Sequence, residues 1–209
     1  MSATTRPPLP TQADGLDVTT GSGPMTRITG RAQVDPVHPV DRSPADALPA
    51  AARWVLAGLR LALGFVFLWA FVDKVFGLGR ATPAEGAWIS GGSPTEGFLA
   101  NAPTGPLAGM FTSIAGAAWA DWVFMLGLAG IGIALMLGIG ARIATVAGAL
   151  MLLLMWAAVL PPANNPVIDD HLVYAGVLVL LLVLGAADVL GFGRSWKALP
   201  LVQRFPVLR

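Results

Sequence analysis

The most polar short stretch in the apolar part of this chain runs from Pro161 to Tyr174 and reads PPANNPVIDDHLVY. It brings together two asparagines, two aspartates and one of the two histidines of the chain. A histidine beside a carboxylate titrates near neutral pH and can exchange protons with a small substrate. His171 with Asp170, or with Asp73 from another helix end, is therefore a candidate catalytic proton-exchange site.

The same stretch also has a structural interpretation. Asn-Asn-Pro favours a turn. Asp169 or Asp170 can cap the following helix, because a carboxylate accepts orphan backbone N–H bonds at a helix N-terminus. One histidine with a few carboxylates at irregular spacing matches no tight metal-ligand pattern, so no metal site is predicted.

The composition indicates an integral membrane protein. Of the 209 residues 55% are hydrophobic and 12% charged, whereas soluble domains carry about 25% charged residues. The thirteen Lys plus Arg nearly balance twelve Asp plus Glu, which gives no indication of a nucleic-acid partner. The absence of cysteine excludes a disulfide, a thiolate nucleophile and an iron–sulfur site built from this chain alone. Redox chemistry would need a bound or partner-supplied cofactor.

The fold class predicted from the apolar pattern is all-α. Residues 1–48 are rich in Pro, Gly and Thr, and we expect a disordered cytoplasmic tail. This tail has no apolar run of the kind found in a secretory signal, so the first spanning helix is expected to act as the insertion signal. A four-helix transmembrane domain is predicted over 49–195, followed by a basic cytoplasmic C-terminal tail over 196–209. Its spans, each long enough for a bilayer, are 51–76, 119–140, 142–160 and 171–190.

The positive charges predict an orientation, because Lys and Arg near helix ends are retained on the cytoplasmic side. With both termini inside, the outer side carries only Lys74 and Arg80, and the inner side carries Arg42, Arg53, Arg142, Arg194, Lys197, Arg204 and Arg209. We therefore expect a multi-pass plasma-membrane protein with both termini in the cytoplasm. An interfacial segment is expected between the first two spans, over 106–118.

This topology predicts that one group of polar residues meets at the outer side, which we call the outer-rim set. Its members come from three helix ends and the polar loop: Asp73, Lys74, Asp121, Asn164, Asn165, Asp169, Asp170 and His171.

Other residues inside the spans have more than one interpretation. Arg60 can pair with Asp188 across the bundle, reach the inner headgroups, or line a site for an anion or a quinone carbonyl. Trp69 can anchor at the interface or stack on a quinone ring. The spacing of Gly130, Ala134 and Gly138 predicts a close-packed face on the second span.

Four segments in order resemble the DoxX/DoxD family of four-helix bacterial and archaeal membrane proteins. They are LRLALGFVFLWAFVDKVFG, GFLANAPTGPLAGMF, GIGIALMLGIGARIATVAGALMLLLMWAA and NNPVIDDHLVYAGVLVLLLVLG. The resemblance covers about residues 51–195, and the second and last segments are most similar to the DoxD branch, the small membrane subunit of thiosulfate:quinone oxidoreductase. It implies an integral membrane subunit of a redox complex, with quinone as cofactor and a partner redox subunit.

Two functions follow as hypotheses from this resemblance. The first is the quinone-facing subunit of an oxidoreductase that takes electrons from a sulfur donor such as thiosulfate. The second is a non-catalytic membrane anchor or assembly subunit of a respiratory or oxidative-stress complex. Whether the chain is an enzyme or a homo-oligomer stays open at this point. The candidate catalytic residues are His171, Asp170 and Asp73, and the candidate quinone-binding residues are Arg60, Trp69, Lys74 and Asn165.

Overall fold

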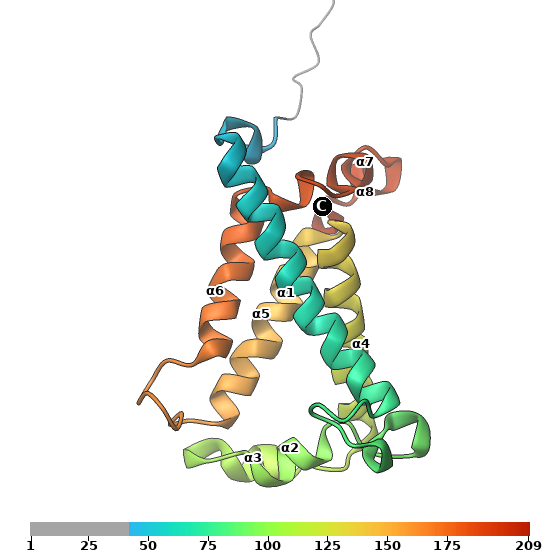
Figure 1. Cartoon of the computed structure of the whole chain (residues 1–209), viewed down its shortest axis with the longest axis vertical. Helices are drawn as coiled ribbons and strands as arrows, with labels where there is room; N and C mark the ends of the chain where they lie inside the picture. The colour runs from blue at the N-terminus through green and yellow to red at the C-terminus, as the bar shows by residue number, and fades with distance from the viewer. Residues whose placement is uncertain (1–41) are drawn as a thin grey trace, which may run out of the picture. The chain divides into compact units, whose positions relative to one another are not determined.

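The computed structural model describes residues 42–209, and within this range it contains helices and no strand (Figure 1). The predicted all-α class is confirmed for this part of the chain. Most of the predicted tail over 1–48 lies outside the described residues. The described part begins beside a short 3₁₀ helix, η1 (Pro44–Ala47), which Ser43 caps with its hydroxyl.

Three helices are long and apolar enough to cross a membrane: α1 (Ala50–Phe76), α4 (Ala118–Leu137) and α5 (Ala141–Ala158). Their bounds lie within three residues of the first three predicted spans, because an uninterrupted apolar run is a local property of the sequence. Apolar helices of this length are consistent with contact with a lipid bilayer.

The fourth predicted span is not confirmed. Helix α6 (Asp170–Val183) has 14 residues, so it is about 21 Å long, whereas a bilayer core is about 30 Å thick. It ends before Gly185, which adopts a left-handed conformation with φ of 69°, and a 3₁₀ helix, η5 (Ala186–Asp188), follows. Residues 171–190 therefore do not form one continuous helix.

The helices pack as a bundle in which α1 lies along α4, and α5 lies between α4 and α6 (Figure 1). The main core contains buried side chains from all four helices, including Phe67, Met125, Leu152 and Leu178. We call the end of the bundle that holds Ala50 the proximal end and the end that holds Phe76 the distal end.

The predicted small-residue face of the second span is wrong at Gly130, whereas Gly138 does pack closely: a Cβ added there would lie 2.7 Å from the carbonyl oxygen of Ala187. Gly130 is exposed, and a Cβ added there would meet no atom within 4 Å, while Gly138 ends α4 in a left-handed conformation. The close approach of α1 and α4 instead uses Gly132, where an added Cβ would lie 2.8 Å from the backbone nitrogen of Leu68. The apolar pattern of a fully hydrophobic helix does not fix its rotation, which is why the spacing indicated the wrong face.

Short helices lie at both ends of the bundle. At the distal end the chain between α1 and α4 forms two 3₁₀ turns, η2 (Ala84–Gly86) and η3 (Trp88–Ser90), and then α2 (Glu96–Asn101) and α3 (Ala108–Thr112), which are joined by η4 (Gly105–Leu107). Figure 1 shows α2 and α3 lying across this end. At the proximal end the chain finishes in α7 (Gly193–Lys197), α8 (Pro200–Arg204) and η6 (Pro206–Leu208).

Candidate functional site

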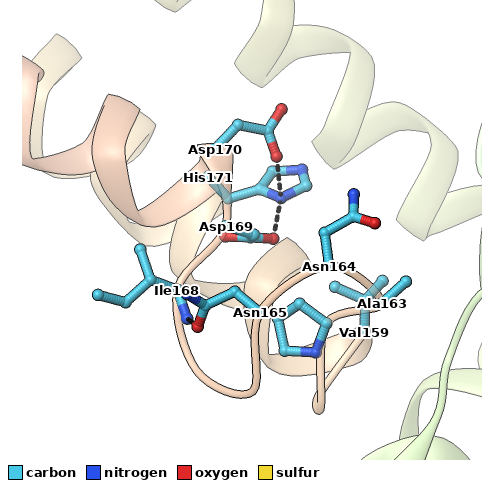
Figure 2. A pocket seen from close by; sticks show the side chains of 9 residues that line it. Val159, Ala163, Asn164, Asn165, Ile168, Asp169, Asp170 and His171 are labelled. Carbon is cyan, nitrogen blue, oxygen red and sulfur yellow. Dashed lines mark hydrogen bonds and ion pairs between the residues drawn. The ribbon is translucent and has the colours of Figure 1, made fainter.

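His171, the histidine predicted to exchange protons, is in the first turn of α6, next to the loop that precedes this helix (Figure 2). Its Nδ1 lies 2.7 Å from Oδ2 of Asp169 and 3.6 Å from Oδ1 of Asp170. Asp169 is the N-cap of α6 and accepts the N–H of Leu172 at 3.2 Å. The predicted helix cap is therefore confirmed for Asp169, and the same carboxylate orients the ring of His171.

The remaining polar residues of this loop stabilise the turn. Oδ1 of Asn165, a candidate quinone ligand, accepts the N–H groups of Val167 and Ile168, both at 2.9 Å. Trp156 Nε1 donates to the carbonyl of Val167 at 2.7 Å. A cavity of about 610 Å³ lies here, and all of its lining residues come from 159–171 (Figure 2). It is a hollow of one exposed loop, with no contribution from another helix.

The electrostatics of this loop are modest. Partial burial acts to raise the pKa of Asp169, but hydrogen bonds from His171 and Leu172 and the charge of His171 outweigh it, so the pKa lies below its ordinary value of 3.8. The carboxylate oxygens of Asp169 and Asp170 and a ring nitrogen of His171 lie within 4.8 Å of one another. Three consecutive residues beside an open hollow do not enclose an ion, and we assign no metal here.

Asp73, predicted as a partner of His171, has a different role. It is 1% exposed and lies in the last turn of α1, where its carboxylate accepts the N–H groups of Arg80 at 3.3 Å and Ala81 at 3.0 Å. No hydrogen bond or ion pair within residues 42–209 joins it to His171. Its bonds attach the chain that follows α1 to the distal end of that helix.

The chain that follows α1 runs over residues 77–95, and Asp121, in the first turn of α4, stabilises the far end of this loop. Its Oδ1 accepts the hydroxyl of Ser93 at 2.9 Å and both the N–H and the hydroxyl of Thr95, at 2.9 and 2.7 Å. The outer-rim set therefore separates into two clusters, one around His171 and one around Asp73, Lys74 and Asp121. The two carboxylates of the second cluster accept hydrogen bonds from the loop over 77–95.

The two terminal nitrogens of Arg60 are engaged with backbone carbonyls, whereas its buried Nε has no hydrogen-bond partner within residues 42–209. Its guanidinium donates to the carbonyls of Leu135 and Met136 at the C-terminus of α4, and to those of Val189 and Leu190 after η5. The predicted pair with Asp188 is wrong, since Asp188 binds Lys197 at 2.6 Å. Carbonyls at a helix C-terminus lack partners and carry partial negative charge, so they satisfy a buried guanidinium without any carboxylate.

Neither Arg60 nor Trp69 lines the cavity at the 159–171 loop, the cavity at the proximal end or the cavity beside Lys74. Trp69 is partly exposed on α1, with its ring centroid 6.0 Å from that of Phe65 on the same surface. This position suits a side chain that faces lipid. Of the four candidate quinone-binding residues, Lys74 alone lines a cavity built from several helices.

That cavity, which we call the Lys74 groove, has a volume of about 480 Å³. It lies at the distal half of the bundle, between α4, α5 and the α2–α3 segment. Its walls are almost entirely aromatic and aliphatic, and the largest side chains that line it are Phe98, Phe111, Trp119, Phe124, Leu150 and Met151.

Lys74 is the one charged residue that lines the groove. Its ammonium lies 5.9 Å from the centroid of the Phe124 ring, which is within cation–π range. Within residues 42–209 no hydrogen bond or ion pair to this ammonium is present, although the charges of Asp73 and Asp121 act on it. The groove therefore offers a ligand one cationic donor in otherwise apolar surroundings.

Analysis of the sequence identified Lys74 but missed the aromatic walls. Phe98 and Phe111 belong to the segment between the first two spans, part of which was expected at the interface. Its apolar residues indicated that this segment packs against another part of the molecule. The sequence did not indicate that it closes over Lys74 and the side of α5.

Comparisons of this chain with protein-family models, with curated proteins and with solved structures find no match. The resemblance to the DoxX/DoxD family therefore stays a prediction.

Proposed function

We propose that this chain is an integral membrane subunit of a redox complex and that it binds a quinone in the Lys74 groove. The observation that carries this proposal is the ammonium of Lys74, which has no hydrogen-bond or ion-pair partner within residues 42–209 and lies in a groove of aromatic and aliphatic side chains. The resemblance to the small membrane subunit of thiosulfate:quinone oxidoreductase supports the choice of quinone.

The chemistry of the groove suits such a ligand. Small-molecule sites have volumes of about 300–1,000 Å³, with mainly apolar walls and few polar groups, and the groove meets each condition. Flat aromatic side chains can stack on a quinone ring, and the ammonium can donate to a ring carbonyl. Lining residues such as Trp119, Val123 and Leu150 are exposed on the outside of the helices, which supports entry from the surrounding lipid.

A partner chain is part of the proposal. This chain has no cysteine, so oxidation of a sulfur compound such as thiosulfate would take place on another subunit. We propose that the complex lies in the plasma membrane with both termini of this chain in the cytoplasm, as the distribution of Lys and Arg favours.

A second function, a non-catalytic anchor or assembly subunit, is favoured by one feature of the groove. No histidine or carboxylate is among its lining residues, and the nearby carboxylates of Asp73 and Asp121 already accept hydrogen bonds from the 77–95 loop. Reduction of a quinone to a quinol requires proton transfer. In this alternative the groove holds a quinone or a lipid, and another chain performs the chemistry.

The first test is thiosulfate-dependent quinone reduction in membrane vesicles from a strain that lacks this chain. The strain is complemented with the wild type, with Lys74→Met, or with Arg80→Gln, a matched control that removes the exposed cation just beyond α1. We expect activity with the wild type and Arg80→Gln and at least a tenfold loss with Lys74→Met at equal abundance. A rate that does not depend on the chain would favour the anchoring role.

A further inference from the structure

A second cavity lies at the proximal end of the bundle, at the opposite end from the Lys74 groove. Its volume is about 200 Å³, much more than the space of one water molecule. Its lining comes from α5, α6 and the C-terminal segment, and three of the lining side chains are cationic: Arg142, Lys197 and Arg209. Within the described part of the chain, no acidic side chain is among its lining residues.

The charges around this cavity do not balance. Lys197 is neutralised by Asp188 at 2.6 Å. Arg142 donates to the carbonyl of Pro206 at 2.8 Å, and the buried Nε of Arg209 has no hydrogen-bond partner in the described part of the chain. Neither guanidinium takes part in an ion pair there, and the other carboxylate at this end, Asp46, binds Arg194.

The start of α5 adds to the positive potential. Gly140 is the N-cap of this 18-residue helix and provides no side-chain hydrogen bond, and the first helical residue, Ala141, lines the cavity. One N–H of the first turn, that of Arg142, donates to the backbone oxygen of Arg209 at 2.8 Å. The N-terminus of a helix carries partial positive charge and attracts anions. Two guanidiniums that take part in no ion pair within residues 42–209 and the first turn of a helix thus lie at one cavity.

We propose that this cavity binds a phosphate group. The planar fork of a guanidinium matches phosphate oxygens, so Arg209 and the remaining donors of Arg142 would form charge-assisted hydrogen bonds to a phosphate. Leu181 and Leu182 provide an apolar wall beside the cations, as a phospholipid headgroup at a membrane surface requires. A lipid headgroup and free phosphate share this chemistry.

The test uses the purified full-length chain in a nonionic detergent and follows its Tm. Inorganic phosphate is titrated against sodium chloride at matched ionic strength, and short-chain phosphatidylglycerol against the corresponding phosphatidylcholine. A rise in Tm with both phosphate and phosphatidylglycerol, or with phosphate alone, supports a site open to free phosphate. A rise with phosphatidylglycerol alone supports a headgroup site. A rise with neither overturns the proposal.

The matched variants are Arg209→Gln and Arg204→Gln. The side chain of Arg209 makes no hydrogen bond in the structure, so its substitution should leave the fold intact, and Arg204 is an exposed cation of the same segment that lies outside the cavity lining. We expect Arg209→Gln to weaken the apparent affinity about tenfold, as the loss of one charge-assisted hydrogen bond predicts. Arg204→Gln should keep wild-type affinity. Wild-type affinity in Arg209→Gln would overturn the proposal.

Discussion

Two cationic side chains of α1, one in each half of the helix, have opposite surroundings. Arg60, at 2% exposure, donates to four backbone carbonyls from two other segments. Lys74 reaches no acceptor within the described residues and lies in an aromatic groove. A cation whose acceptors are part of the fold is structural, whereas one without an acceptor is available to a ligand.

The difference has a physical basis in the two ends of the bundle. At the proximal end α4 ends beside Arg60 and presents free carbonyls, which a five-donor guanidinium can satisfy. At the distal end the carboxylates of Asp73 and Asp121 are beside Lys74 but accept hydrogen bonds from the 77–95 loop. The ammonium of Lys74 therefore faces only the ring of Phe124 and the apolar walls of the groove within the described residues.

The largest expected effect is that of Arg60→Leu, which leaves four carbonyls without a donor. We expect a loss of several kcal/mol of stability, because each buried carbonyl left without a donor costs about 1–3 kcal/mol, and a severe loss of membrane abundance. Arg60→Lys should be intermediate, because one ammonium cannot reach all four carbonyls. The Tm in detergent measures stability, and immunoblots of membranes measure abundance. Normal abundance with lost quinone binding would place Arg60 in a ligand site and would contradict its assignment as a structural residue.

A smaller structural effect is expected from Asp121→Ala, which removes three hydrogen bonds at the distal end. We expect a loss of about 1.5–3 kcal/mol, typical of hydrogen bonds to a charged group, with faster deuterium exchange over residues 77–95. Glu96→Ala is the matched control, since Glu96 is an exposed acid beside Thr95. Unchanged exchange in Asp121→Ala would show that this carboxylate does not hold the loop.

The expected effect of Lys74→Met is on binding more than on stability. Methionine keeps the apolar length of the side chain and removes the ammonium, so quinone affinity should fall about tenfold, equal to about 1.4 kcal/mol. Tm should stay within a few degrees of the wild type, because no hydrogen bond within the fold is lost. Titration of tryptophan fluorescence with a soluble quinone measures the affinity. A collapse of Tm would put Lys74 in the same structural class as Arg60.

The smallest effect on stability is expected from Asp169, in the loop before α6. Like Lys74 and Arg60 it is a charged side chain, but it is acidic and its partners are a histidine and a backbone N–H. Its pKa is lower in the folded chain than the ordinary 3.8, so its contribution to stability is present above that value and is lost as pH falls through the lower folded pKa. Asp169→Asn keeps an N-cap and removes the charge. The variant should therefore lose less stability than the wild type between pH 5 and 3 in thermal unfolding. Identical pH profiles would exclude this contribution.

Features that depend on one segment were predictable from the sequence. The all-α class, the three long helices and the cap at Asp169 follow from apolar runs and from a carboxylate before a helix. The end of α6 was missed, although Gly185 follows it, because the apolar residues continue beyond that glycine.

Features that depend on how helices rotate and meet were not predictable. The acceptors of Arg60 come from residues 75 to 130 positions away, and carbonyls have no signature in a sequence. The same applies to the Lys74 groove, whose walls come from α2 to α5. Depth in the membrane placed Asp73 and His171 at one level, but depth does not determine whether two side chains meet.

Binding of a quinone in the Lys74 groove can be examined by labelling membranes with a photoreactive quinone analogue and mapping the modified residues by mass spectrometry. We expect labels on groove residues such as Phe98, Trp119 and Met151, with labelling at least tenfold weaker in Lys74→Met and unchanged in Arg80→Gln. Labels confined to the loop over 159–171, or equal labelling in Lys74→Met, would contradict it.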